Sequence, residues 1–300
     1  MSGPKILGGV AAGIAAGTLL GFYVLAPNVE GGPTAVDSDV QEQLDSTRDE
    51  LSASTAGLDA DDAVLDEMAA GAVRDDLKDH SVLVVAMPDA DQELVDAQRA
   101  LLSDAGATDA GTLSLADDAV SQDKADAVKS LAANTLPAGA KLSEDRRDPG
   151  FHFGQVVGQA LRSAGDRAKE ASESDRSLVL GALDKSGFID GGIPEVDSAD
   201  AVVVVTGPTG GFAGTFTADL AAGLDDVTGG VVLAGDWAST TDGGALEILR
   251  ADRADTEKVS TVDNADRTAG RITVVRALAQ QLDGKAGSYG AAESAATPSL

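Results

Sequence analysis

Short runs of branched apolar residues alternate with longer stretches of helical periodicity between residues 80 and 286. The strongest strand signals are SVLVVAM (81–87) and AVVVVT (201–206), and weaker strands are expected at 111–115, 188–189, 230–234 and 258–262. Helices are expected at 91–105, 123–135, 154–163, 175–186, 215–223, 243–251 and 268–282. Continuous apolar runs indicate strands that are buried on both faces, which is typical of parallel sheets covered by helices. The pattern predicts an α/β fold with a mostly parallel, doubly wound sheet.

This α/β domain is expected to span residues 80–286. A charged, proline-containing break at 137–150 could divide it into two lobes. Residues 287–300 are small and polar, and they predict a flexible tail. Two regions precede the domain, namely residues 1–33, which end in a Gly/Pro hinge, and residues 34–79, which are polar and nearly free of helix breakers.

Residues 6–26 form an uncharged apolar run, which as a helix would span about 30 Å, the thickness of the hydrocarbon layer of a membrane. Lys5 precedes the run and acidic residues dominate after it, so the positive-inside rule places the bulk of the chain outside the cytoplasm. We therefore expect an uncleaved, single-pass plasma-membrane anchor, with a cleaved signal peptide as the alternative. Glycines recur every four residues on one face and favour close packing with another helix, unless they merely fill the anchor: Gly9, Gly13, Gly17 and Gly21.

Four leucines in the 34–79 region are spaced by seven residues: Leu44, Leu51, Leu58 and Leu65. This spacing fills one position of a coiled-coil heptad, whereas the second seam position is mostly polar. The region is therefore expected to form a coiled-coil-like stalk that joins a homodimer. The alternative is a single amphipathic helix that lies on the α/β domain.

The composition excludes several classes of function. Fifty acidic residues against 22 basic ones give a formal charge of −28, which repels nucleic acid, so no nucleic-acid partner is expected. The chain has no cysteine, three methionines and two histidines, His80 and His152, and it shows no evident copper-ligand or other metal site. Because it also lacks GxSxG and HExxH motifs, we expect neither an enzyme nor a cofactor.

Candidate binding residues follow the strands, because ligands of open α/β sheets bind at the carboxyl ends of the strands. The loop after residue 206 is rich in glycine and could present amides to an anion or a peptide carboxylate. A tight turn, a helix cap and a surface ion pair between Asp263 and Arg271 are the structural alternatives. The expected partner-binding residues are Thr206, Gly207, Gly210, Gly211, Asp236, Trp237, Thr261, Asp263 and Arg271.

Several segments together resemble a known family. They are LPAGAKLS at 136–143, the helical stretch 179–188, STVD at 260–263 with GRIT at 270–273, and the Tyr289-Gly290 pair. With the anchor, stalk and α/β domain, they are similar to the actinobacterial copper-transport family known as mycobacterial copper transport protein B, MctB. The resemblance implies a cell-envelope protein of copper transport and copper homeostasis, and copper enters as a ligand through this resemblance alone.

The residues also support a second hypothesis. An anchored, dimeric chain without catalytic motifs is typical of a non-enzymatic scaffold. Such a scaffold would bind an extracytoplasmic protein or peptide partner through the loops at the strand ends. Cell-wall remodelling or cell division, for example as a regulator of a peptidoglycan hydrolase, would be its setting.

Overall fold

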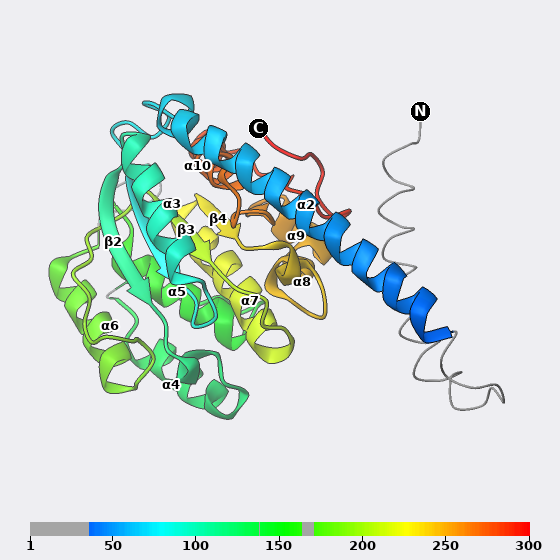
Figure 1. Ribbon diagram of the computed structural model, residues 1–300. Helices are drawn as coiled ribbons and strands as arrows, with labels where there is room; N and C mark the ends of the chain where they lie inside the picture. The colour runs from blue at the N-terminus through cyan, green and yellow to red at the C-terminus, as the bar shows by residue number, and fades with distance from the viewer. Residues whose placement is uncertain (1–35, 138, 164–170) are drawn as a thin grey trace. The chain divides into compact units, whose positions relative to one another are not determined.

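The computed structural model describes residues 36–137, 139–163 and 171–300 (Figure 1). The expected membrane anchor and its stripe of Gly9, Gly13, Gly17 and Gly21 lie outside the described residues. Within the described part of the chain, no helix combines the length and the apolarity needed to cross a membrane. The chain divides into two compact units, Met1–Asp59 and Ala60–Leu300.

The elements follow the expected alternation of strands and helices. The strands are β1 (Ser81–Ala86), β2 (Thr108–Ser114), β3 (Ala201–Val205), β4 (Val231–Ala234), β5 (Ser260–Val262) and β6 (Ser288–Tyr289). The α-helices are α2 (Val36–Ala72), α3 (Gln92–Asp104), α4 (Ala125–Asn134), α5 (Pro149–Leu161), α6 (Glu173–Lys185), α7 (Gly211–Thr228), α8 (Ala245–Ala251), α9 (Arg253–Thr256) and α10 (Thr268–Leu282). Short 3₁₀ helices are η3 (Asp117–Val120), η4 (Gln122–Lys124) and η5 (Trp237–Thr240).

The described strands form a single six-stranded sheet in the order β2-β1-β3-β4-β5-β6. All five neighbouring pairs are parallel, which confirms the expected α/β fold with a parallel sheet. The register Val82↔Ala201 pairs a strand before residues 137–150 directly with a strand after them. These residues therefore do not divide the domain into two lobes, because one sheet and one compact unit continue across them.

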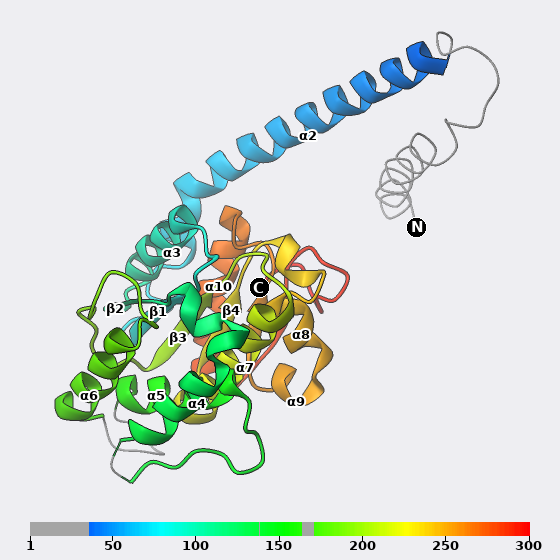
Figure 2. The same ribbon diagram turned by 90° about the horizontal axis from the view of Figure 1, so that it is seen from below.

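The two faces of the sheet bury alternate residues of the same strands. In β1, Leu83 and Val85 face a cluster covered by α4 to α8, whereas Val82 and Val84 face a second cluster. That second cluster is covered by α3, α10 and the last turns of α2, so the sheet lies between two layers of helices (Figure 1, Figure 2). Every residue of β3 is buried, as its unbroken valine run predicts.

Helices α5 and α7 pack with their backbones in contact. A Cβ atom at Gly154 of α5 would lie 2.3 Å from the carbonyl oxygen of Leu220, and one at Gly223 of α7 would lie 2.1 Å from that of Phe151. The distance between two packed helices depends on the side chains at the contact, so only glycine allows this approach. The glycines of these two helices are therefore requirements of the packing.

The C-terminal segment differs from the flexible tail that we expected for residues 287–300. Strand β6 pairs with β5, and the amide of Ala296 donates to the carbonyl oxygen of Ser288 at 2.8 Å. Arg276 of α10 donates to the carbonyl oxygen of Leu300 at 2.7 Å, and Leu300 packs against the second apolar cluster. A two-residue strand is too short to produce a hydrophobic pattern, which explains why the sequence did not reveal it.

Both edges of the sheet are covered by the chain itself. Along β2, Asp197 and Asp190 donate backbone hydrogen bonds of 2.9 Å to the carbonyl oxygens of Ala110 and Ser114. Along β6, Thr297 forms a parallel bridge with Tyr289. Exposed sheet edges are templates for pairing with other chains, and here loop segments occupy them.

Arg146, in the break between α4 and α5, binds two carboxylates of the layer that contains α7 and α9. Its guanidinium lies 2.9 Å from Asp219 and 2.5 Å from Asp255, and it stacks over the ring of Phe151 at 4.2 Å. One cation thus pairs with one buried carboxylate, Asp255, and one half-buried carboxylate, Asp219. Burial, reinforced by the nearby charge of Asp148, raises the pKa of Asp219 to about 6.

This shift predicts that stability falls as the pH rises from about 4 to 6. The folded protein binds a proton at Asp219 in this range, whereas the unfolded chain, with the ordinary carboxyl pKa near 3.8, does not. Asp219→Asn keeps an acceptor for Arg146 but cannot bind the proton. We therefore expect the change in the free energy of unfolding with pH to become smaller by on the order of 2–3 kcal/mol in this variant. Urea unfolding at pH 4.5 and 7.5 measures it, with exposed Asp184→Asn as the matched control. An unchanged pH slope in Asp219→Asn would contradict the assignment.

Candidate functional site

The carboxyl ends of β1 and β3 are the place where the strand order reverses. Strand β1 lies between β2 and β3, and the chain leaves β1 for α3 on one face and β3 for α7 on the other. Such a switch point opens a crevice beyond the strand ends. The two loops meet there, because the carboxylate of Asp89 accepts the amide of Thr209 at 2.8 Å. A Cβ at Gly207 would lie 2.0 Å from the Asp89 carbonyl oxygen, so glycine is required at that position.

A pocket of about 460 Å³ lies at this edge, on the side of α3 and α10. Apolar and backbone groups of α3 and of the β3 loop form part of its lining. Among the lining side chains, five are acidic and one is basic: Asp89, Asp91, Glu93, Asp236 and Asp266, with Arg271. We call it the acidic pocket.

The carboxylates of the acidic pocket are only partly compensated. Burial raises the pKa of Asp266, and although the positive charge of Arg267 lowers it, the charges of Asp236 and Asp62 raise it further. A pocket lined by one sign of charge focuses its field and concentrates ions of the opposite sign. The arrangement therefore favours a cationic group as its occupant.

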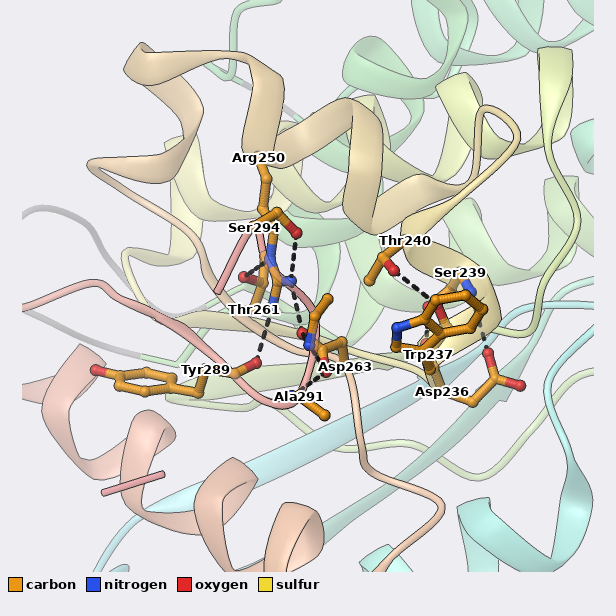
Figure 3. A network of polar contacts seen from close by, with 11 residues as sticks. Asp236, Trp237, Ser239, Thr240, Arg250, Thr261, Asp263, Tyr289, Ala291 and Ser294 are labelled. Carbon is orange, nitrogen blue, oxygen red and sulfur yellow. Dashed lines mark hydrogen bonds and ion pairs between the residues drawn. The ribbon is translucent and has the colours of Figure 1, made fainter. Parts of the chain in front are cut away.

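Four of the residues that the sequence nominated line this pocket: Thr206, Gly207, Asp236 and Arg271. Trp237 follows Asp236 directly, and 59% of its surface is exposed. The carboxylate of Asp236 accepts the amide of Ser239 at 3.1 Å and so caps η5, which fixes the segment that carries the indole (Figure 3). Asp236 and Trp237 thus lie at the carboxyl edge of the sheet, and their role in binding stays a prediction.

Gly210 is the N-cap of α7 and Gly211 is the first residue of that helix, and neither is part of the pocket lining. A Cβ at Gly210 would lie 2.3 Å from the carbonyl oxygen of Asp242, so the loop after η5 packs directly against the start of α7. Gly211 has a φ of +66°, a conformation that favours glycine. Both glycines therefore have structural roles at the start of α7, in place of the tight turn that was the alternative.

Thr261 and Asp263 belong to a buried network around Arg250 (Figure 3). The guanidinium of Arg250 lies 2.7 Å from the carboxylate of Asp263, and the two side chains are 3% and 0% exposed. It also donates to the hydroxyl of Thr261 and to the carbonyl oxygen of Tyr289, each at 2.8 Å. The expected pairing of Asp263 with Arg271 is therefore wrong, because Arg250 fills that role.

The remaining contacts of Asp263 hold the C-terminal segment. Its carboxylate accepts the amides of Ala291 at 2.6 Å and Ala292 at 3.2 Å. A Cβ at Gly290, whose φ is +130°, would lie 2.2 Å from the same carboxylate. Asp263 thus acts as a structural clamp for the residues after β6, and it is too deeply buried to contact a partner.

Sequence reasoning missed most of the acidic lining, namely Asp89, Asp91, Glu93 and Asp266. The rule that ligands bind at the carboxyl ends of strands, which nominated Asp236, also applies to the loop after β1. It could therefore have nominated Asp89 and Asp91 as well. Asp266 and Glu93 enter the pocket only through the packing of α10 and α3. Within the described residues, no group of three or more His, Cys, Asp or Glu side chains could hold a metal ion.

Arg250→Ala is expected to destabilise the protein by about 3–5 kcal/mol, because it leaves Asp263 buried without its cation. Arg253→Ala removes an ion pair whose arginine is 91% exposed, and it should change stability by less than about 0.5 kcal/mol. Chemical denaturation measures both, and limited proteolysis should cut the 288–300 segment sooner in Arg250→Ala. Equal effects of the two substitutions would contradict the clamp.

Comparison with known proteins agrees with the family resemblance in the sequence. A family model described as "Copper transport outer membrane protein, MctB" matches residues 6–300. Proteins named copper transporter MctB from Mycobacterium tuberculosis and Mycobacterium bovis are 32% identical over 285 residues, which cover 92% of this chain and 91% of theirs. The protein of that name from Mycobacterium leprae is 34% identical over 229 residues, or 73% of this chain and 72% of its own. The chain therefore belongs to the MctB family.

Proposed function

We propose that the protein is a single-pass component of the cell envelope that serves copper homeostasis, and that its α/β domain binds a partner protein outside the plasma membrane. The family and the names of the relatives support the link to copper. The apolar run at residues 6–26 supports the anchor, and the acidic residues that follow it support the orientation. The acidic pocket supports partner binding as the mode of action.

The observation that carries this proposal is the acidic pocket with Trp237 beside it. A lysine or arginine side chain of a partner would find five carboxylates there, and the exposed indole offers a surface for apolar or cation–π contact. Tryptophan is among the residues that contribute most to interfaces. The formal charge of −28 would also steer a basic partner toward the domain.

The donor set of the chain favours an indirect role toward copper. Cu(I) prefers thiolate and thioether ligands, and the chain has three methionines and no cysteine. Its two histidines have other partners: His80 lies 3.9 Å from the carboxylate of Asp200, and His152 lies 3.0 Å from the carbonyl oxygen of Ser143. We therefore assign recognition of copper itself to the partner.

We also propose that the protein forms a homodimer through α2. Leu44, Leu51 and Leu58 are 40%, 66% and 52% exposed, and their seven-residue spacing keeps them along one stripe of the helix. Leu65, the fourth of the series, is half-buried. This exposed series also favours the alternative function, a dimeric scaffold for a cell-wall or division factor such as a peptidoglycan hydrolase regulator.

Charge reversal in the acidic pocket tests partner binding. A photocrosslinker at position 209, an exposed residue of the loop after β3, captures the partner of the full-length chain in its own membrane, and Glu93→Lys is expected to reduce capture about tenfold, which corresponds to about 1.4 kcal/mol. Glu93→Lys should also fail to restore normal copper content to cells that lack the protein. Asp104→Lys, an exposed reversal at the other end of α3, is the matched control and should behave as the unmodified chain. Full capture and full restoration by Glu93→Lys would refute the proposal.

The dimer is tested separately in the full-length chain in detergent. Leu51→Glu places a charge in the leucine stripe and is expected to raise the dimer dissociation constant at least tenfold, as measured by analytical ultracentrifugation. Val64→Glu alters an equally exposed apolar residue of α2 that lies off the stripe, and it should leave the constant unchanged. A monomer at all concentrations, or equal effects of both substitutions, would contradict dimerisation through this stripe.

A further inference from the structure

Helix α10 receives its N-terminal cap from another helix. Its own cap residue, Arg267, makes no capping hydrogen bond with its side chain. Instead, Asp62 of α2 accepts the amide of Thr268 at 3.3 Å, and Asp66, one turn later, accepts the hydroxyl of Thr268 at 2.5 Å. Both carboxylates are favourable at the positive end of α10. The part of α2 that supplies them, residues 60–72, belongs to the same compact unit as α10.

Arg271 connects this cap to the acidic pocket. Its guanidinium lies 3.0 Å from the carboxylate of Asp66 and donates to the hydroxyl of Thr268 at 2.7 Å and to the backbone carbonyl oxygen of Asp266 at 3.1 Å. The same side chain lines the acidic pocket beside Asp236 and Asp266. One cation therefore stands between a carboxylate of α2 and the carboxylates of the pocket.

Arg276 provides an internal comparison. It is another arginine of α10, its guanidinium lies 4.0 Å from the carboxylate of Asp76 just after α2, and it is not part of the pocket lining. Arg267 cannot serve for this comparison, because it lies 3.8 Å from the pocket carboxylate of Asp266 as well as 3.1 Å from Asp62. Asp66 and Asp76 are thus two acidic residues that each pair with an arginine of α10. The pairs differ in that the arginine held by Asp66 borders the pocket.

We propose that Arg271 is a charge switch for the acidic pocket. While Asp66 holds it, the pocket keeps its negative potential; when Asp66 withdraws, Arg271 turns toward Asp236 and Asp266 and neutralises them. The pKa of Asp266 is raised chiefly by burial and further by the charge of Asp236, which supports the presence of negative charge around this carboxyl for Arg271 to neutralise. Asp66 is a positioning residue, and the seating of α2 on α10 sets the charge that the pocket offers.

This inference deepens the proposed function, because it names what would control access of a basic partner to the pocket. It does not need the partner for its test. The chain contains a single tryptophan, Trp237, which is 59% exposed and adjacent to Asp236. Its fluorescence can be quenched by the cation caesium, by the anion iodide and by neutral acrylamide. Quenching by each ion is divided by quenching by acrylamide, which corrects for the accessibility of the indole. The ratio of the two normalised values then reports the charge near Trp237.

We expect caesium quenching of Trp237, relative to its quenching of free tryptophan amide, to exceed the same relative value for iodide in the unmodified full-length chain in zwitterionic detergent at constant ionic strength. Asp66→Asn keeps a capping side chain and releases Arg271, so the normalised caesium-to-iodide ratio should fall at least twofold. Asp76→Asn removes the same charge from the segment just after α2 but releases Arg276, which does not line the pocket, so the ratio should stay close to that of the unmodified chain.

Two results would overturn the switch. One is an equal change of the ratio in Asp66→Asn and Asp76→Asn. The other is an undiminished fall in the ratio when Asp66→Asn is made in an Arg271→Gln background, where no guanidinium remains to move. The partner proposal is judged by Glu93→Lys alone, so the two can fail independently.

Discussion

The burial of strands on both faces is the constraint on which the rest of the structure depends. A strand such as β3, with no polar position, can exist only between two apolar layers. The chain therefore has to place helices on both sides of the sheet, and parallel strands bring all carboxyl ends to one edge. That edge is where the polar loops gather, and it holds the acidic pocket.

Much of this arrangement could be predicted from the sequence, because it follows from local patterns. The valine runs gave β1 and β3 nearly to the residue, and helical periodicity gave α3 and α10. Elements too short to produce a hydrophobic pattern could not be predicted, and β6, with only two residues, is an example. Helix α7 extends beyond its expected range at both ends, because a glycine-rich segment reads as a loop although its first residues pack as a helix.

The site was predicted in part for the same reason. The position of Asp236 and Trp237 after a strand follows from topology, which the sequence supplied. The buried ion pair of Asp263 with Arg250 does not follow from topology, because no sequence pattern around Arg250 indicates that its guanidinium will bind the carboxylate of Asp263. Likewise, the contacts of Arg271 depend on Asp66, 205 positions away in the chain. Pairings over such separations arise from packing, so composition and spacing cannot identify them.

The occupied edges of the sheet have a consequence for how copies of this protein can be crowded together. A sheet whose outer strands are bonded to loops cannot extend from one molecule into the next, so high local density does not promote fibrous aggregation of the domain. Copies of the protein can therefore associate only through surfaces that recognise side chains rather than backbone groups. Such surfaces can be selective, because their affinity depends on residue identity, and so many copies can lie close together without losing their individual folds.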